Sequence, residues 1–237
     1  MKSLQKTKIT LIQFPGSNCD QDCLDVLAYE FGLECRVVRH TETDLGAASG
    51  VILPGGFSYG DYLRGGALAS HAPIMESIQK FAKQGGPIIG ICNGFQILTE
   101  AKLLPGTLLK NAGQRFICKF VNLKTAAGQS DYHKSLSTKS NLRLPIAHGE
   151  GRFHASAQDL EVLRKEQRIL LQYCDDSGVL TPEANPNGAL DHIAGIVSEN
   201  GRILGLMPHP ERAAFSSLPN AKTDGRQLWQ CFIEMCG

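Results

Sequence analysis

Short runs of valine, isoleucine and leucine recur along the chain, separated by segments whose apolar residues are spaced as on one face of a helix. The runs predict strands at about residues 8–13, 35–39, 50–54, 87–91, 168–174, 193–198 and 202–207. The longer segments predict helices at about residues 19–31, 73–84, 94–104, 155–165 and 224–236. Because the strand runs are continuously apolar, we expect an α/β fold with a central, mostly parallel sheet flanked by helices.

The middle of the chain is less regular. Residues 114–124 are expected to form a strand, residues 126–141 a polar loop and residues 181–187 a turn. The last two strands are expected to form an antiparallel pair joined at residues 199–201. The chain has no internal repeat or linker-like segment, so residues 1–237 are predicted to form a single domain.

One segment combines a strand, a tight turn and a helix around a cysteine. An isoleucine-rich run ends at Cys92, with Gly90 two positions before it, Gly94 two positions after it, and a helical pattern from Phe95 onward. This is the cysteine counterpart of the G-x-S-x-G elbow, in which glycines permit strained dihedrals and close contacts. The positive end of the helix favours a thiolate, so Cys92 is a candidate nucleophile.

A cysteine nucleophile needs a base, and the base needs a carboxylate that orients it. His209 and Glu211, with prolines on both sides of the histidine, would project to one side of an extended segment. His148 and Glu150 repeat the spacing among glycines. Spacing does not decide between the pairs, although the stiffer proline-containing segment favours His209.

A glycine-rich loop follows the strand at residues 50–54. Gly55 and Gly56 would let backbone N–H groups approach a ligand closely. The chain has no G-x-x-x-x-G-K-[ST] motif, which excludes a P-loop. The loop is therefore a candidate oxyanion hole, completed by the N–H of Asn93.

Five strings spread over the chain resemble the glutamine amidotransferase family that uses a Cys–His–Glu triad. They lie at residues 14–20, 54–66, 90–98, 147–153 and 207–212. The resemblance implies the triad-type glutamine amidotransferase (flavodoxin-like) fold. It also implies that Cys92 is the nucleophile, that His209 is the base and that Glu211 orients it.

The same resemblance assigns the supporting residues of the site. The backbone N–H groups of Gly56 and Asn93 would form the oxyanion hole, and Gln96 would contact the substrate glutamine. The family uses the C-terminal His and Glu, which leaves the role of residues 148–150 open as substrate pocket, partner contact or structural loop.

The strings are most similar to glutaminase subunits of multi-subunit complexes. This implies that glutamine is hydrolysed here and that ammonia passes to a separate synthetase subunit, where ATP and magnesium are expected. A third small subunit is a further partner that this resemblance allows. No cofactor is expected in this chain, because no segment of it is typical of an ATP site. The alternatives are a glutaminase of another amidotransferase, a cysteine-elbow hydrolase of the same fold, or a catalytically silent regulatory subunit.

Composition narrows the remaining possibilities. The net charge of +1 does not favour nucleic acid or an anionic membrane as a partner, and no apolar run is long enough to span a bilayer. The polar start, residues 1–8, lacks the apolar centre of a signal peptide. Eight cysteines without secretory features indicate reduced thiols and a cytoplasmic protein. Their spacing is unlike that of common zinc sites, so no metal is expected.

Overall fold

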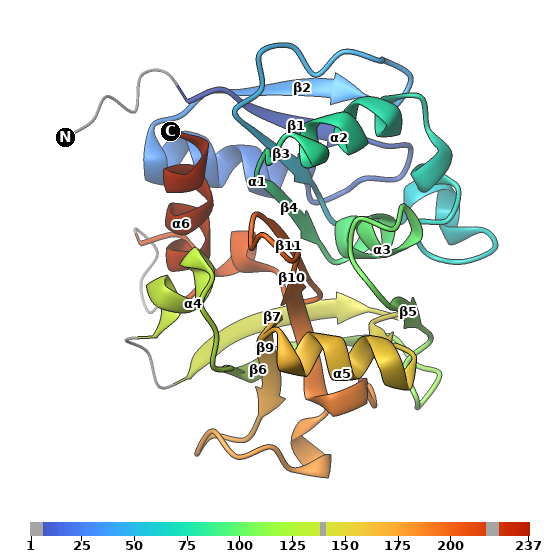
Figure 1. Cartoon of the computed structure of the whole chain (residues 1–237), viewed down its shortest axis with the longest axis vertical. Coiled ribbons are helices and arrows are strands. Elements are labelled where there is room, and N and C mark those ends of the chain that lie inside the picture. Colours follow the sequence, from blue (N-terminus) through green and yellow to red (C-terminus); the bar gives the residue numbers. More distant parts are fainter. Residues whose placement is uncertain (1–6, 138–140, 217–222) are drawn as a thin grey trace.

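The computed structural model describes residues 7–137, 141–216 and 223–237. Its main sheet has nine strands within these residues (Figure 1). Their order is β2 (Cys35–Arg39), β1 (Ile9–Gln13), β3 (Gly50–Leu53), β4 (Ile88–Ile91), β11 (Ile203–Leu206), β10 (Ile193–Val197), β9 (Ile169–Cys174), β6 (Ile117–Thr125) and β7 (Leu142–His148). Pairing is parallel from β2 to β11 and antiparallel from β11 to β7. Only β10 and β6 run against the common direction, so the sheet is mostly parallel as predicted.

Helices cover both faces of the parallel half. The helices of the whole described chain are α1 (Asp20–Asp25, extended by a π-helical turn at Val26–Glu30), α2 (Ile74–Lys83), α3 (Asn93–Glu100), α4 (Asp131–Leu136), α5 (Ala157–Lys165) and α6 (Arg226–Cys236). Side chains of α3 pack over Gly90 and Gly205, whereas α6 packs over Gly50. Gly90 is paired with Leu53 on one side and with Gly205 on the other, so these three residues face the same side of the sheet. Gly50 lies three residues before Leu53 on the same strand and therefore faces the other side. It follows that α3 and α6 lie on opposite faces of the sheet (Figure 1).

The predicted strands and helices of the parallel half are present with small differences at their ends. Two elements of the middle of the chain were missed. β7 was not predicted, because Pro145 interrupts its pattern, and a proline normally argues against a central strand. Residues 126–141 were expected to be loop but include α4, which Ser130 caps by accepting a hydrogen bond from the N–H of His133. The helix buries Tyr132 and Leu136, and this tertiary packing outweighs its short length.

Two short strands were also absent from the predictions. β5 (Thr107–Leu109) and β8 (Arg152–His154) pair in a separate antiparallel sheet. Two parts of the sequence expectations lie outside the described residues: residues 1–6 of the polar start and residues 138–140 of the expected loop.

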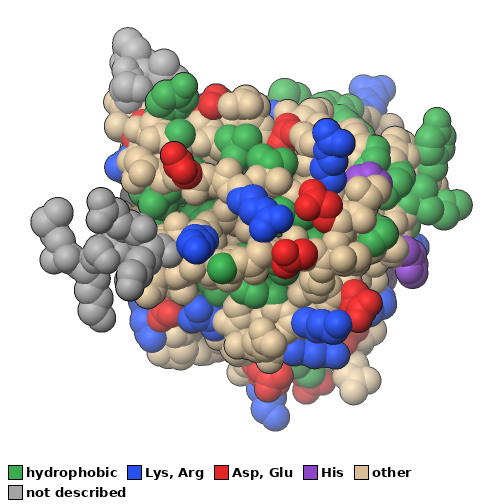
Figure 2. All heavy atoms as spheres, turned by 90° about the horizontal axis from the view of Figure 1, so that it is seen from above, with side chains coloured by type: hydrophobic (Ala, Val, Ile, Leu, Met, Phe, Trp, Pro, Cys, Tyr) green, Lys and Arg blue, Asp and Glu red, His purple; other side chains and the backbone are tan. Residues whose placement is uncertain are grey.

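The surface agrees with the near-neutral net charge. Figure 2 shows basic and acidic side chains interspersed on the face seen from above. Within the described residues, every helix is too short or too polar to cross a bilayer.

Four neighbouring strands end at the same edge of the sheet. β1 leads into residues 14–19, β3 into Gly55 and Gly56, β4 into Cys92, and β11 into the segment that carries His209. β3, β4 and β11 are buried along their whole length, so they form a rigid base for these loops. The carboxyl ends of parallel strands are where α/β proteins commonly bind their ligands.

Gly94 provides a test of how tightly α3 is packed on this base. A Cβ at Gly94 would overlap the backbone carbonyl of Leu53. In an open helix, Gly→Ala stabilises by about 1 kcal/mol, but overpacking against backbone costs about 1–3 kcal/mol. Because the overlap is with backbone, the cost lies at the upper part of this range, and we expect Gly94→Ala to lower the free energy of unfolding in urea by about 1–2 kcal/mol.

The matched control is Gly113→Ala, where a Cβ would meet no atom within 4 Å. This variant should remain within about 0.5 kcal/mol of the wild type. Equal stability of Gly94→Ala and the wild type would show that α3 can move away from β3.

Candidate active site

Cys92 lies at the sharp turn between β4 and α3. Its backbone has φ 52° and ψ −103°, a conformation that is strained for a residue with a side chain. The N–H of Cys92 donates to the carbonyl of Leu206 at 2.8 Å and so holds the turn to β11. Neither Gly90 nor Gly94 has a positive φ; a Cβ at Gly90 would lie 2.7 Å from the carbonyl oxygen of Gly94. The strain therefore resides on Cys92, and the two glycines allow close packing.

The surroundings of the thiol are partly polar. Cys92 Sγ lies 3.8 Å from the carbonyl oxygen of Ala147, and the residue is almost fully buried. Asn93 begins α3, so its N–H belongs to the first turn, which has no intrahelical acceptor. This N–H and the positive end of the helix favour negative charge beside the sulfur.

His209 and Glu211 are in direct contact. His209 Nδ1 lies 2.5 Å from Glu211 Oε1, and the two residues are only 1% and 0% exposed. The expected geometry was nevertheless wrong, because residues 210–213 form a 3-10 turn rather than an extended segment. The turn begins at Pro210, and it brings the carboxylate back to the imidazole from two residues further along the chain.

Charge in the site favours an imidazolium at His209. Burial opposes its protonation, but the negative charges of Glu211 and of a Cys92 thiolate outweigh burial and raise the pKa of His209 well above its usual value. A cavity of about 150 Å³ is lined by Gly56, Cys92 and His209 together. The structure thus brings the predicted nucleophile, base and one oxyanion donor to a single small space.

His148 and Glu150 do not form a corresponding pair. The Nδ1–H of His148 donates to Asn111 Oδ1 at 3.1 Å, and Glu150 Oε2 accepts a hydrogen bond from the N–H of Gly65 at 3.1 Å. His148 Nε2 is buried and has no hydrogen-bond partner among the described residues. Burial, and then the nearby charge of His209, lower the pKa of His148 to about 4.

The amide of Gln96 is already engaged by protein groups. Gln96 Oε1 accepts from Asn93 Nδ2 at 2.7 Å, and Gln96 Nε2 donates to the carbonyl of Glu150 at 2.6 Å. Gln96 lies one helical turn beyond Cys92 but does not line the small cavity. Its side chain joins α3 to the segment that carries Glu150.

Two residues near the triad were not singled out from the sequence. Cys19 Sγ lies 3.9 Å from His209 Nδ1, and Arg212 Nη2 donates to the same sulfur at 3.1 Å. Potential ligand atoms of Cys19, His209 and Glu211 all lie within 4.8 Å of one another. However, His209 Nδ1 is hydrogen-bonded to Glu211, and the guanidinium of Arg212 donates to the sulfur of Cys19. The cluster is therefore organised by hydrogen bonds rather than as a cation site.

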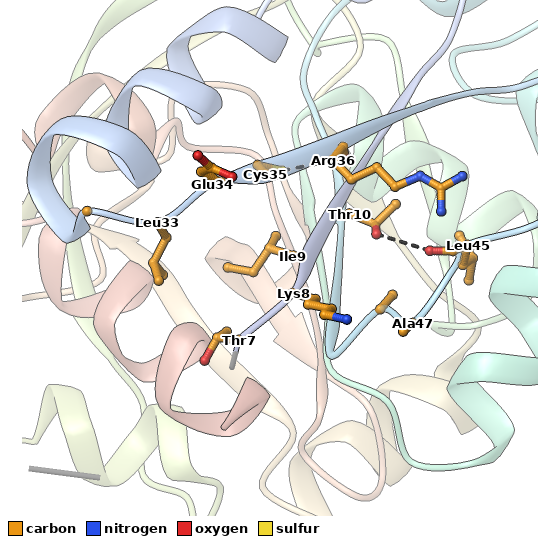
Figure 3. Close-up of a pocket in the computed structure, with 12 residues that line it drawn as sticks. Thr7, Lys8, Ile9, Thr10, Leu33, Glu34, Cys35, Arg36, Leu45 and Ala47 are labelled. Atoms are coloured by element: carbon orange, nitrogen blue, oxygen red, sulfur yellow. Dashed lines mark hydrogen bonds between the residues drawn. The ribbon is translucent and has the colours of Figure 1, made fainter. Parts of the chain in front are cut away.

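A cavity of about 760 Å³ lies elsewhere in the molecule. Residues from the starts of β1 and β2 line it, among them Lys8, Thr10, Cys35 and Arg36 (Figure 3). These are the amino ends of the strands, whereas Cys92 follows the carboxyl end of β4. The larger cavity is therefore separate from the triad.

Comparisons with known proteins place this chain in a family. Residues 6–233 match the model of the CobB/CobQ-like glutamine amidotransferase domain. Phosphoribosylformylglycinamidine synthase subunit PurQ from Methanosarcina acetivorans is 46% identical over 227 residues, which are 96% of this chain and 97% of the relative. PurQ from Thermosynechococcus vestitus is 46% identical over 229 residues, with 95% of each chain covered. The chain belongs to the PurQ family of glutamine amidotransferases.

Solved structures agree with this assignment. A chain in the structure of PurLQS from Thermotoga maritima is 37% identical, with a TM-score of 0.82, and 98% of this chain and 100% of that chain are covered. A glutamine amidotransferase from the same organism has a TM-score of 0.54 at 17% identity over 96% of this chain and 81% of that one, which supports the fold alone. The predicted family, fold and enzyme class are confirmed, and the PurQ assignment is favoured over the alternative enzymes and the silent subunit.

The low pKa of His148 predicts part of the pH dependence of stability. In the unfolded chain a histidine binds its proton near pH 6.5, whereas folded His148 stays neutral down to about pH 4. The unfolded state therefore binds more protons between these values, and stability falls as the pH is lowered from 6.5 towards 4. Between pH 7 and pH 4.5, the unfolding free energy of the wild type should fall by about 2–3 kcal/mol more than that of His148→Gln, at 1.36 kcal/mol per pKa unit.

Urea unfolding at the two pH values measures this difference. His154→Gln, which replaces an exposed histidine on β8, is the matched control. A His148→Gln variant with the same acid sensitivity as the wild type would show that His148 is protonated in the folded protein.

Proposed function

We propose that this chain is the glutaminase subunit of a phosphoribosylformylglycinamidine synthase. It hydrolyses glutamine to glutamate and supplies ammonia to a separate ATP-dependent synthetase subunit. That subunit converts formylglycinamide ribonucleotide to formylglycinamidine ribonucleotide in de novo purine biosynthesis. The observation that carries the proposal is the cavity shared by Cys92, His209 and Gly56 in a chain of the PurQ family.

The first half of the reaction forms a thioester. The Cys92 thiolate attacks the side-chain carbonyl carbon of glutamine, and the electron pair of the carbonyl moves to oxygen. The N–H groups of Gly56 and Asn93 stabilise this oxyanion. When the tetrahedral intermediate collapses, the C–N bond breaks, His209 gives its proton to the nitrogen, and ammonia leaves.

The second half releases glutamate. His209, now neutral, takes a proton from water, which attacks the thioester carbonyl and regenerates the thiolate as the C–S bond breaks. Glu211 keeps Nδ1 of His209 oriented throughout, because it accepts the hydrogen bond at 2.5 Å. Gln96 is proposed to contact the substrate glutamine from α3, with its amide oriented by Asn93 and Glu150.

The proposal places ATP and magnesium in the synthetase subunit. The resemblance to glutaminase subunits of multi-subunit complexes implies this placement, and the relative of known structure, which is part of PurLQS, supports a complex. A third small subunit is proposed as an additional partner on the same ground. A cytoplasmic location is proposed because all eight cysteines are free thiols, as is typical of a reducing compartment.

Replacing the nucleophile should separate the two activities of the complex. With the synthetase subunit present, Cys92→Ala should abolish glutamine-dependent product formation, because only the thioester step needs this sulfur. Product formation from added ammonium salt should remain close to that of the wild type. Both rates are measured by following product with each nitrogen source.

Cys118→Ala is the matched control, because Cys118 is an exposed cysteine on β6. It should retain both activities. Glutamine-dependent turnover by Cys92→Ala near the wild-type rate would contradict the proposed mechanism.

The loop at residues 58–66 connects the protein surface to the site. Asn93 Oδ1 accepts from the N–H of Ser58 at 3.1 Å, and Asn93 Nδ2 lies 3.3 Å from Asp61 Oδ1. At the tip of the loop, Tyr62 and Leu63 are 75% and 88% exposed, and Leu63 has a φ of 72°. A partner that covers the tip could therefore change how the N–H of Asn93 is aimed.

We expect the synthetase subunit with its nucleotide ligands to raise glutamine turnover at least about tenfold, or roughly 1.4 kcal/mol in the barrier. Leu63→Asp should weaken this stimulation, because it places a charge where the partner would cover the tip of the loop. The slow basal rate should stay unchanged. Val179→Asp is the control at another exposed apolar position. Glutaminase assays with and without the partner test both points, and full activity of the isolated chain would contradict them.

A further inference from the structure

The segment from Phe14 to Cys19 follows β1 and lies against the glycine loop of the site. The carbonyl of Gly55 accepts hydrogen bonds from the N–H of Asn18 at 3.3 Å and the N–H of Cys19 at 3.2 Å. The N–H of Phe57 donates to the carbonyl of Gly16 at 2.9 Å. These bonds make Ser17 and Gly56 an isolated antiparallel bridge.

This bridge fixes the direction of one N–H group. In a planar trans peptide, the carbonyl of one residue and the N–H of the next point in opposite directions. Because Asn18 and Cys19 hold the carbonyl of Gly55, the N–H of Gly56 is directed away from them. In a bridge with bonds on the flanking residues, the N–H of Gly56 also faces away from Ser17.

The N–H of Gly56 is thereby left available to the cavity. Among the described residues, no main-chain or side-chain acceptor bonds to it. Gly56 and Cys92 line the same cavity of about 150 Å³. The contacts of the segment 14–19 therefore determine where the oxyanion donor points.

The two backbones approach too closely to allow side chains. Gly16 has a φ of 89°, and a Cβ there would overlap the carbonyl oxygen of Phe57. Gly56 has a φ of 153°, and its Cβ would lie 2.6 Å from the carbonyl oxygen of Gly16 and 2.7 Å from the Cα of Ser17.

Ser17 holds the turn itself. Its N–H donates to the carbonyl of Phe14 at 3.0 Å, and its Oγ accepts from the N–H of Phe14 at 3.1 Å. The backbone and the side chain of Ser17 are thus both hydrogen-bonded to Phe14, the residue that directly follows β1. The turn is anchored to the rigid sheet, and the glycine loop is anchored to the turn.

We propose that residues 14–19 are a positioning element that aims the N–H of Gly56 at the oxyanion, with Gly16 and Ser17 as its positioning residues. This proposal rests on the proposed glutaminase function. The element acts on the step in which negative charge develops on oxygen, and it does not act on the thiol.

The experiment compares two reactions of Cys92 in the complex with the synthetase subunit. Glutamine hydrolysis passes through an oxyanion. Alkylation by iodoacetamide does not, because the thiolate displaces iodide directly as the S–C bond forms and the C–I bond breaks. Gly16→Ala should lower kcat for glutamine at least about tenfold, since loss of an oxyanion donor typically costs about 10²–10³. KM and the alkylation rate should change less than threefold.

Gly85→Ala is the matched control. Gly85 also has a positive φ, of 80°, but a Cβ there would meet no atom within 4 Å, and it precedes the amino end of β4. This variant carries the same type of backbone strain and should keep the wild-type kcat. Thermal unfolding of both variants shows whether each one is folded.

Ser17→Ala provides a second variant that removes only the Oγ contact. It should lower kcat about threefold, again with unchanged alkylation, and it decides the question if Gly16→Ala does not fold. Unchanged kcat in the folded variants, or kcat and alkylation that fall together, would overturn the proposal. A wild-type complex that does not hydrolyse glutamine would instead refute the proposed function.

Discussion

The strained backbone of Cys92, with its positive φ, is the constraint around which the neighbouring structure is arranged. A non-glycine residue in such a conformation costs about 1–3 kcal/mol and persists only when its surroundings determine it fully. Here the surroundings are the bond from the N–H of Cys92 to Leu206 and the burial of α3 from Asn93 to Thr99. Phe95 of α3 packs over Gly205 of β11, so the helix that follows the cysteine is held against the strand that accepts its N–H. The strained turn is the geometry that exposes the sulfur to the small cavity.

The second constraint is the distribution of charge between two buried histidines. Glu211 raises the pKa of His209 against the effect of burial, whereas burial lowers the pKa of His148, which has an amide as its partner. The charge of His209 further lowers the pKa of His148. Of these two histidines, His209, which lines the cavity with Cys92, is therefore the one whose protonated form is favoured.

The sequence was most informative where a function depends on a few adjacent residues. The turn at Cys92 was predictable because its strand, glycines and helix are contiguous. The spacing alone did not decide between His209 and His148, and the resemblance to the family was needed, because the difference depends on Asn111 and Gly65, which bind His148 and Glu150 from distant segments. Cys19 contacts His209 across 190 positions of sequence, and no local pattern marks such a contact. The 3-10 turn at Pro210 was missed because proline is compatible with both an extended segment and the first position of a helical turn.

The antiparallel half of the sheet also contributes to the site, and this explains the proline in β7. β7 pairs only with β6, so one of its edges is free of strand partners in the described sheet. The carbonyl of Pro145 accepts the N–H of His209 at 2.8 Å, and the carbonyl of Ala147, two residues on, lies 3.8 Å from Cys92 Sγ. Carbonyls two residues apart in a strand point to the same edge. Proline lacks an N–H, but it keeps a carbonyl, which is the group this edge uses. The proline that argued against a strand here is therefore compatible with the role of β7, whose carbonyls contact the backbone of His209 and the sulfur of Cys92.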